Sequence, residues 1–299
     1  MRTANPPQKN AGRRPVQGAP PHPAPPRERP AAAPPLPAAP RRDRGEGWLY
    51  GRHAVAAALA NPARSWRRLA VLASEADEAA ALLAAARAVR RGSRREPTET
   101  PLQVVERPAL TLLLPEGAVH QGWALEVEPL DAPPLDAVLR AVATTPGRAV
   151  IVVLDQVGDP HNVGAVLRSA AAFGAAAVVV AERGTPPVSG VLAKAASGAL
   201  ERVPLVRVVN VARALDRLKA AGYWCCGLAA EAPAALAALD LGPRVALVLG
   251  SEGGGLRRLV REHCDYLARL PTRPDQPSLN VSNAAAIALY EVMRNDPAG

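Results

Sequence analysis

The stretch at residues 149–180, AVIVVLDQVGDPHNVGAVLRSAAAFGAAAVVV, decides the fold. Residues 149–154 are a continuous apolar run, which is typical of a strand that is buried on both of its faces. A polar turn follows and leads into a predicted helix at residues 163–173, and residues 176–180 form a second apolar run. A strand, a helix and another strand in this order predict a parallel sheet.

The same alternation continues toward the C-terminus. Further strands are predicted at residues 203–208, 224–228 and 245–249, and further helices at residues 192–200, 211–221, 256–262 and 281–294. Unbroken apolar strands predict an α/β domain over residues 148–299 whose parallel sheet is covered by helices on both faces. Ligands bind such sheets beyond the carboxyl ends of the strands, so we expect a site in the loops at that edge.

A smaller α/β module precedes this domain. Residues 48–128 contain predicted helices at 50–60 and 75–90 and predicted strands at 68–73, 101–105 and 122–127. Residues 129–147 contain four prolines and predict a linker that includes a short helix at 135–143. Residues 1–47 combine proline, alanine and arginine without hydrophobic periodicity. They predict a disordered tail that is either a basic arm contacting RNA or a passive extension.

Composition limits the kinds of partner. The 299 residues carry a formal net charge of +9, which favours a polyanionic partner such as RNA over an acidic small molecule. Cys225, Cys226 and Cys264 lack the spacing of a zinc site or of a disulfide framework, so no metal is expected. The sequence contains neither an apolar run long enough to span a membrane nor a recognisable signal peptide. A soluble cytoplasmic protein with no membrane partner is therefore expected.

Residues 161–174 carry polar side chains within an otherwise apolar helical pattern. Asn162 lies close to the predicted start of the helix, where capping is one interpretation and ligand contact the other. Arg168 stands in a run of alanine, valine and leucine, and a buried arginine there would need an anionic or hydrogen-bonded partner such as a phosphate. The alternative interpretation is that Arg168 lies on the solvent face of the helix.

Residues 247–256, LVLGSEGGGL, end a predicted buried strand with a glycine-rich turn. Glycine allows the backbone to approach a ligand closely and to adopt a positive φ. The spacing of Gly250, Gly253 and Gly255 does not match the dinucleotide fingerprint, and the Gly-Lys-Ser/Thr of a P-loop is absent. Glu252 would repel a phosphate, so we expect a cationic or hydroxyl-bearing group beside this turn.

Residues 278–283, SLNVSN, form a dense polar cluster at the start of the last predicted helix. One helix cap requires fewer side-chain hydrogen-bonding groups than the four in this cluster. Ser282 or Asn283 can account for the cap. Ser278 and Asn280 are then predicted to contact a ligand.

Together these three segments resemble the three signature motifs of the SpoU (TrmH-type) ribose 2′-O-methyltransferases of the SPOUT superfamily. The segments follow one another in the same order, and the matching residues are Asn162, Arg168, Glu252, Ser278 and Asn280. The resemblance covers residues 149–294. The stretches 50–55, YGRHAV, and 120–122, HQG, also resemble the RNA-binding accessory domain of the RlmB-like branch, although this second match is shorter.

The resemblance implies a fold, a cofactor and partners. It implies an α/β fold whose parallel sheet carries a C-terminal trefoil knot, preceded by a small α/β RNA-binding domain with contacts at Arg52 and His53. It also implies an S-adenosyl-L-methionine pocket that uses the backbone around Gly250, Leu270 and Leu279. Two subunits are expected to pair through the knotted domain as a homodimer.

The same resemblance implies roles for the polar residues. Asn162, Arg168, Glu252, Ser278 and Asn280 are expected to be the catalytic and RNA-facing set. The family view makes Arg168 the base for the 2′-hydroxyl proton, but an arginine pKa above about 12 keeps the guanidinium protonated. An RNA phosphate that orients Arg168 could take the proton while Arg168 stabilises the developing negative charge.

The function implied by the resemblance is methylation of a guanosine ribose in large-subunit (23S) rRNA. One alternative is the same reaction on tRNA, and another is an inactive RNA-binding protein of ribosome assembly. The accessory module favours rRNA, and the complete set of polar residues argues against an inactive protein.

Overall fold

The computed structural model describes residues 45–90, 101–273, 275–276 and 278–294. Its larger sheet has seven strands in the order β7-β6-β5-β10-β8-β11-β9, and all of its paired strands are parallel. The strands are β5 (Ala149–Asp155), β6 (Ala177–Ala181), β7 (Leu205–Val208), β8 (Trp224–Leu228), β9 (Ala234–Ala235), β10 (Arg244–Gly250) and β11 (Tyr266–Arg269). The predicted parallel sheet is therefore confirmed.

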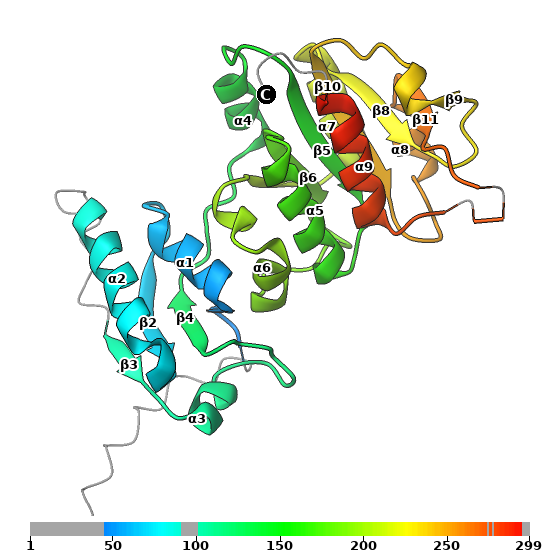
Figure 1. Ribbon diagram of the computed structural model, residues 1–299. Helices are drawn as coiled ribbons and strands as arrows, with labels where there is room; N and C mark the ends of the chain where they lie inside the picture. The colour runs from blue at the N-terminus through cyan, green and yellow to red at the C-terminus, as the bar shows by residue number, and fades with distance from the viewer. Residues whose placement is uncertain (1–44, 91–100, 274, 277, 295–299) are drawn as a thin grey trace, which may run out of the picture. The chain divides into compact units, whose positions relative to one another are not determined.

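Helices cover both faces of this sheet. One face packs against α5 (Pro160–Ala172), α6 (Gly190–Ala196) and α9 (Val281–Met293), and the other packs against α4 (Leu135–Val142), α7 (Val211–Ala220) and α8 (Arg258–Glu262). Figure 1 shows α5 and α9 side by side on their face of the sheet. This arrangement brings the start of α5 and the start of α9, which are far apart in sequence, to neighbouring positions.

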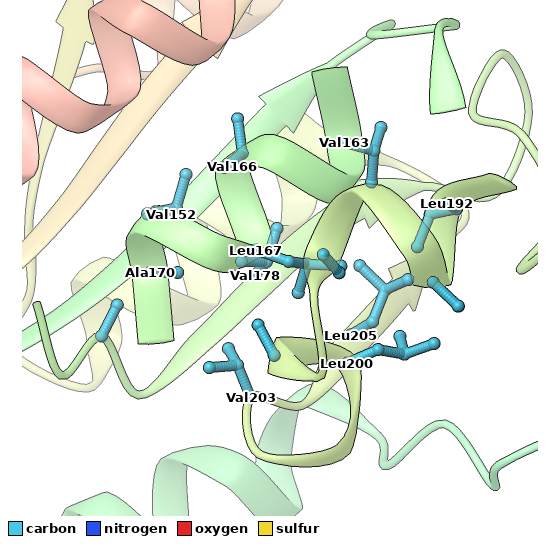
Figure 2. Packing of buried hydrophobic residues seen from close by; sticks show 14 of the residues in the cluster. Val152, Val163, Val166, Leu167, Ala170, Val178, Leu192, Leu200, Val203 and Leu205 are labelled. Carbon is cyan, nitrogen blue, oxygen red and sulfur yellow. The ribbon is translucent and has the colours of Figure 1, made fainter. Parts of the chain in front are cut away.

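The alternation of side chains along β5 explains why the strand is apolar throughout. Val150, Val152 and Leu154 face the layer of α5, whereas Ile151 and Val153 face the layer of α7. Figure 2 shows part of the cluster in which α5 meets the first of these layers. The residues of α5 in this cluster are Val163, Val166, Leu167 and Ala170, and they are buried together with Val152, Val178, Leu192, Leu200 and Leu205. Removing a buried leucine from such a core typically costs about 2–5 kcal/mol of stability. The core thus holds α5 rigidly against the sheet.

Residues 48–127 contain a second, mixed sheet of four strands in the order β1-β4-β2-β3. Its strands β1 (Trp48–Tyr50), β4 (Trp123–Val127) and β2 (Trp66–Val71) pair antiparallel, and β3 (Leu102–Val104) pairs parallel to β2. The helices of this part are α1 (Arg52–Ala60), α2 (Ala76–Arg90) and α3 (Arg107–Leu112). The α/β character that was predicted for this module is present.

Several elements differ from the sequence-based expectations. The helix predicted at 192–200 ends at Ala196, because Ser197 and Gly198 adopt left-handed conformations, and a 3₁₀ turn (Ala199–Glu201) follows. β11, β9, β1 and α3 were not predicted, since each is short and lacks a long apolar or periodic pattern. The proposed tail at 1–47 lies almost wholly outside the described residues. No helix in the described parts is both long and apolar enough to cross a membrane.

Candidate functional site

A cavity of about 370 Å³ opens at the carboxyl edge of the parallel sheet. The loops after β8, β10 and β11 and the first turn of α9 form its wall. The lining combines apolar side chains from leucines with carboxylate, hydroxyl and guanidinium groups. The residues that the family resemblance implies for a cofactor pocket, namely Gly250, Leu270 and Leu279, all lie in this lining, together with Glu252 and Ser278.

The glycine-rich turn after β10 folds back on itself. Ser251 and Gly255 close it with two backbone hydrogen bonds, in which Gly255 N donates at 2.9 Å and Ser251 N donates at 3.2 Å. A Cβ atom on Gly250 would stand 2.0 Å from the carbonyl carbon of Gly255, so no other residue fits at Gly250. Gly253 and Gly255 have φ values of +80° and +60°, which L side chains rarely adopt. Glycine therefore serves here to let the turn close, as well as to bring backbone to the pocket wall.

Three of the five predicted polar residues meet at the edge of this cavity. Asn280 Nδ2 donates to Glu252 Oε1 at 2.6 Å and to Asn162 Oδ1 at 3.0 Å. Asn162 Nδ2 donates to the same Glu252 oxygen at 2.9 Å. Each of the three sequence motifs thus contributes one member to a closed hydrogen-bonded cluster, which we call the amide–carboxylate cluster. The Asn162 side chain is nearly buried, whereas Glu252 and Asn280 are exposed to solvent.

The structure corrects the expected position of Asn162 at the start of α5. Asp159 is the N-cap residue of this helix: its Oδ1 accepts a hydrogen bond from His161 N at 2.9 Å, and Pro160 occupies the first helical position. The helix starts three residues earlier than predicted because proline suits that position. Asn162 is therefore free of the capping role, and its amide faces Glu252.

The capping assignment at α9 also needs correction. Asn280, rather than Ser282 or Asn283, is the N-cap residue, and its Oδ1 accepts from the backbone N and the hydroxyl of Ser282 at 2.9 and 2.6 Å. The same side chain uses Nδ2 to reach Glu252 and Asn162. Asn280 therefore serves both as a helix cap and as a member of the cluster. An amide can serve both purposes because it carries an acceptor and two donors.

Arg168 does not occupy the buried position that its apolar neighbours suggested. It lies on the exposed side of α5, about 120° around the helix axis from Asn162. Within the part of the chain that the structure describes, no hydrogen bond or ion pair involves its guanidinium. The prediction that Arg168 is buried was wrong. Successive residues of a helix point in different directions, so a residue that follows apolar core residues in the sequence can itself face the solvent. The structure does not bring Arg168 into the amide–carboxylate cluster.

The two residues expected to contact RNA in the smaller module open α1, and both are exposed. The Arg52 Nε donates to Glu78 Oε1 at 2.9 Å, and this hydrogen bond holds the pKa of the Glu78 carboxyl below its usual range. The other matching stretch, 120–122, lies close by, since Gly51 N donates to the backbone oxygen of Trp123 at 3.2 Å. Burial, followed by the charges of Arg107 and Lys194, lowers the pKa of His120.

Two ion pairs beside the pocket were not anticipated from the sequence. Glu231 and Arg261 form an exposed pair within the pocket lining. Asp155, at the end of β5, forms a fully buried carboxylate that pairs with Arg257. The sequence could have predicted a partner for Asp155. This aspartate ends an apolar strand, and a buried carboxylate requires partners. The other pair joins Glu231, in the loop after β8, to Arg261 of α8, 30 residues further on, and the sequence gives no pattern for it.

Comparison with known proteins adds to this geometry. The model of the SpoU rRNA Methylase family matches residues 149–290. The chain is 39% identical over 249 residues to the 23S rRNA (guanosine-2'-O-)-methyltransferase RlmB of Xylella fastidiosa, an alignment that covers 83% of this chain and 96% of the relative. It is 47% identical over 178 residues to the protein of the same name from Coxiella burnetii, covering 58% of this chain and 70% of that relative.

Solved structures share the arrangement of elements. The SpoU methyltransferase AviRb of Streptomyces viridochromogenes, in complex with the cofactor AdoMet, aligns with a TM-score of 0.65 and 24% identity over 83% of this chain and 89% of that chain. An AdoMet-bound rRNA methyltransferase of Sinorhizobium meliloti aligns with the same TM-score and 21% identity, over 83% and 86% of the two chains. These SPOUT proteins carry a trefoil knot, and the described chain has their fold.

Proposed function

Because this chain belongs to the SpoU rRNA methylase family, in its RlmB branch of RNA ribose 2′-O-methyltransferases, we propose that it methylates the 2′-hydroxyl of a guanosine in 23S rRNA. The observation that carries the proposal is the amide–carboxylate cluster. Three motifs separated by up to 118 residues place Asn162, Glu252 and Asn280 within hydrogen-bonding distance of one another, beside a pocket of cofactor size. A merely structural polar cluster would not require an open, exposed edge.

S-adenosyl-L-methionine is the proposed cofactor, and the cavity fits it. The volume of about 370 Å³ lies within the range of small-molecule pockets, about 300–1,000 Å³. The leucine side chains of the lining suit an adenine ring, and the carboxylate of Glu252, which has no cationic partner among the described residues, suits a cation. The cofactor supplies a methyl group on a positively charged sulfur. The proposed role of Gly250, Leu270 and Leu279 is to hold it through backbone and apolar contacts.

The polar residues are proposed to handle the ribose. The amide–carboxylate cluster offers preorganised donors and an acceptor for the 2′-hydroxyl and its neighbours, with Ser278 on the same wall of the pocket. Its two amides hold the Glu252 carboxylate in one orientation. Transfer to an oxygen requires the hydroxyl to lose its proton and builds negative charge on that oxygen. A fixed network of this kind stabilises such charge without having to reorganise.

Arg168 is proposed to contact the RNA backbone. Its guanidinium is exposed and has no protein anion among the described residues, so a phosphate can approach its fork of donors. An arginine held by a phosphate can stabilise an alkoxide, while a phosphate oxygen receives the proton. Arginine itself stays protonated throughout, because its ordinary pKa lies above about 12.

We further propose that two chains pair through α9. Ile287 and Tyr290 of this helix are 46% and 56% exposed, and the Tyr290 ring contacts Phe173 at the end of α5. Exposed apolar side chains beside a functional site are typical of an interface between copies of a chain. Light scattering should give twice the monomer mass for the wild type and the monomer mass for Ile287→Glu. A monomeric wild type at micromolar concentration would contradict this part of the proposal.

The smaller module is proposed to bind the RNA. The proposed domain limits are 48–128 for this module, 129–147 for the linker and 148–299 for the methyltransferase domain. Arg52 and His53 are its proposed contacts, supported by their exposure at the start of α1. An enzyme with this substrate would act in the cytoplasm, where ribosomal RNA is located.

Transfer of tritium-labelled methyl groups to total RNA tests the reaction. The wild type should label 23S rRNA, and digestion should release the label as 2′-O-methylguanosine. Label in tRNA would support the alternative substrate, and no label at all would support a non-catalytic RNA-binding protein. Arg213→Ala, a change of an exposed arginine on α7 at the opposite face of the sheet, is a matched control for Arg168→Ala and should leave the transfer unchanged.

A further inference from the structure

The glycine-rich turn, residues 250–257, needs a support that its own side chains do not provide. Three of its residues are consecutive glycines, and Glu252 and the three glycines are exposed. Glycine loses more conformational freedom than any other residue when it is ordered. The turn nevertheless supplies a continuous part of the pocket wall and carries Glu252 into the amide–carboxylate cluster. The backbone hydrogen bonds between Ser251 and Gly255 close the turn itself, and contacts outside the turn must hold its two ends in place.

Asp155 supplies such a contact at the C-terminal end of the turn. Its carboxylate is fully buried and accepts two hydrogen bonds from Arg257, from the backbone N at 3.0 Å and from Nε at 2.8 Å. The Arg257 Nη2 atom completes the ion pair at 2.6 Å from Asp155 Oδ1. The Arg257 side chain remains 48% exposed, so water solvates part of its charge. The carboxylate thus fixes both the backbone and the side chain of the residue at which the turn ends.

The same aspartate also lies beside the N-terminal end of the turn. Asp155 and Gly250 are partners in the parallel register of β5 and β10. Both ends of the turn are therefore held at one residue of a rigid central strand. This arrangement fixes the span of the turn, and a closed loop with fixed ends has fewer conformations than a free one.

We propose that Asp155 is a positioning residue for the cofactor pocket, because it holds the 250–257 turn in the shape that binds S-adenosyl-L-methionine and presents Glu252. The inference rests on the proposed function for the identity of the cofactor. Asp155 is not a catalytic residue, since its side chain is fully buried and occupied by Arg257. Its effect reaches the reaction through the backbone of the turn.

The test compares Asp155→Asn with the wild-type chain in calorimetric titrations with S-adenosyl-L-methionine. Asparagine keeps the shape of the side chain but removes the charge that pairs with Arg257. The dissociation constant should rise about tenfold, the value expected when one molecule in ten keeps the binding shape. The KM for the cofactor should rise in parallel, while kcat at saturating cofactor stays close to that of the wild type. A purely stabilising role would lower the melting temperature without this split.

Two further variants keep the test decisive. Arg257→Gln weakens the same contact from the exposed side and should reproduce the loss of affinity even if Asp155→Asn does not fold. Arg258→Gln removes the neighbouring exposed pair with Glu262 and should change nothing, because exposed pairs of this kind contribute little. Unchanged affinity in both folded variants of the Asp155–Arg257 pair would overturn the proposal.

Amide hydrogen exchange separates this proposal from the proposed function. The amide of Gly255 donates to Ser251 O, so its exchange reports whether the turn is closed. The exchange should accelerate about tenfold in Asp155→Asn without any ligand present. A wild-type chain that does not bind S-adenosyl-L-methionine would contradict the proposed function. Unchanged exchange of Gly255 in the variant would contradict the positioning role.

Discussion

Arg168 and Arg52 are both exposed arginines that are proposed to contact RNA, but they differ in whether a carboxylate of the protein pairs with them. Arg52 is held by the Glu78 carboxylate, whereas Arg168 has no anionic partner among the described residues. A phosphate that binds Arg52 must displace a carboxylate, and a phosphate that binds Arg168 displaces only water. We infer from this difference that Arg168 is available for the reaction. Arg52 contributes to a surface whose affinity for RNA is lowered by the acidic residue beside it.

The largest effect is expected at Arg168. Arg168→Ala should lower kcat by about 10²–10³-fold, the loss typical of removing one donor that stabilises developing negative charge. Arg168→Lys should restore little of this, because an ammonium cannot reproduce the fork of the guanidinium. Stability against urea should stay within about 0.5 kcal/mol of the wild type, since the side chain is exposed. Near-normal turnover of Arg168→Lys would remove the proposed role.

An intermediate effect is expected at Asn280, where one side chain has two roles. Asn280→Ala removes the cap of α9 and should destabilise the protein by about 1 kcal/mol. Asn280→Asp keeps a capping oxygen but places a second carboxylate against Glu252, so it should keep the helix cap while repulsion between the two carboxylates opens the cluster and lowers activity at neutral pH. Urea titrations and single-turnover transfer measure the two properties. Equal activity in Asn280→Asp and wild type would show that the amide donor is dispensable.

A smaller effect is expected at the Arg52–Glu78 pair. Arg52→Ala should weaken rRNA binding by roughly two- to fivefold and reduce the salt slope by about one counterion. Glu78→Gln should strengthen binding by a similar factor, because it frees Arg52 for a phosphate. Filter binding at several salt concentrations measures both. The comparison between the two arginines fails if Glu78→Gln weakens binding.

The smallest effect is expected when the pH is changed, and it concerns the contribution of the Arg52–Glu78 pair to rRNA affinity. The hydrogen bond from Arg52 lowers the pKa of Glu78, so the carboxylate stays charged at and above the ordinary glutamate range and gains a proton only at more acidic pH. The ratio of rRNA affinities between Glu78→Gln and wild type should therefore be constant from pH 5 to pH 8. A ratio that approaches one on lowering the pH within this window would show that the pair is already opening there.

Much of the architecture could be predicted because it depends on local patterns. The apolar runs at β5, β6 and β8 and the periodicity of α7 are properties of continuous segments, and the structure has these elements within a few residues of their predicted limits. β11 and β9 could not be predicted in the same way, since each is short, at four and two residues, and carries no long apolar run or periodic pattern. Their place in the sheet follows from tertiary contacts that no local pattern records.

The candidate site could also be predicted only in part, in the features that depend on local sequence. The residue types at 162, 252 and 280 marked a polar site, but their mutual hydrogen bonds required the fold that brings α5, the glycine turn and α9 together. The choice of Asn280 over Ser282 as the cap depended on backbone geometry at one residue. The apolar neighbours of Arg168 in the sequence predicted a buried side chain. The structure shows instead that Arg168 lies on the solvent-facing side of α5, so its side chain is exposed.

Alkaline hydrolysis of 23S rRNA that has been treated with the protein shows whether the methyl group lies on a ribose 2′-oxygen. Alkali cleaves RNA through the free 2′-hydroxyl, so a ribose that carries a 2′-O-methyl group resists cleavage at its own position. We expect one resistant guanosine after treatment with wild-type protein and S-adenosyl-L-methionine, and none after a treatment of the same length with Arg168→Ala. Methyl incorporation without any resistant position would place the methyl group on a base and would contradict ribose methylation.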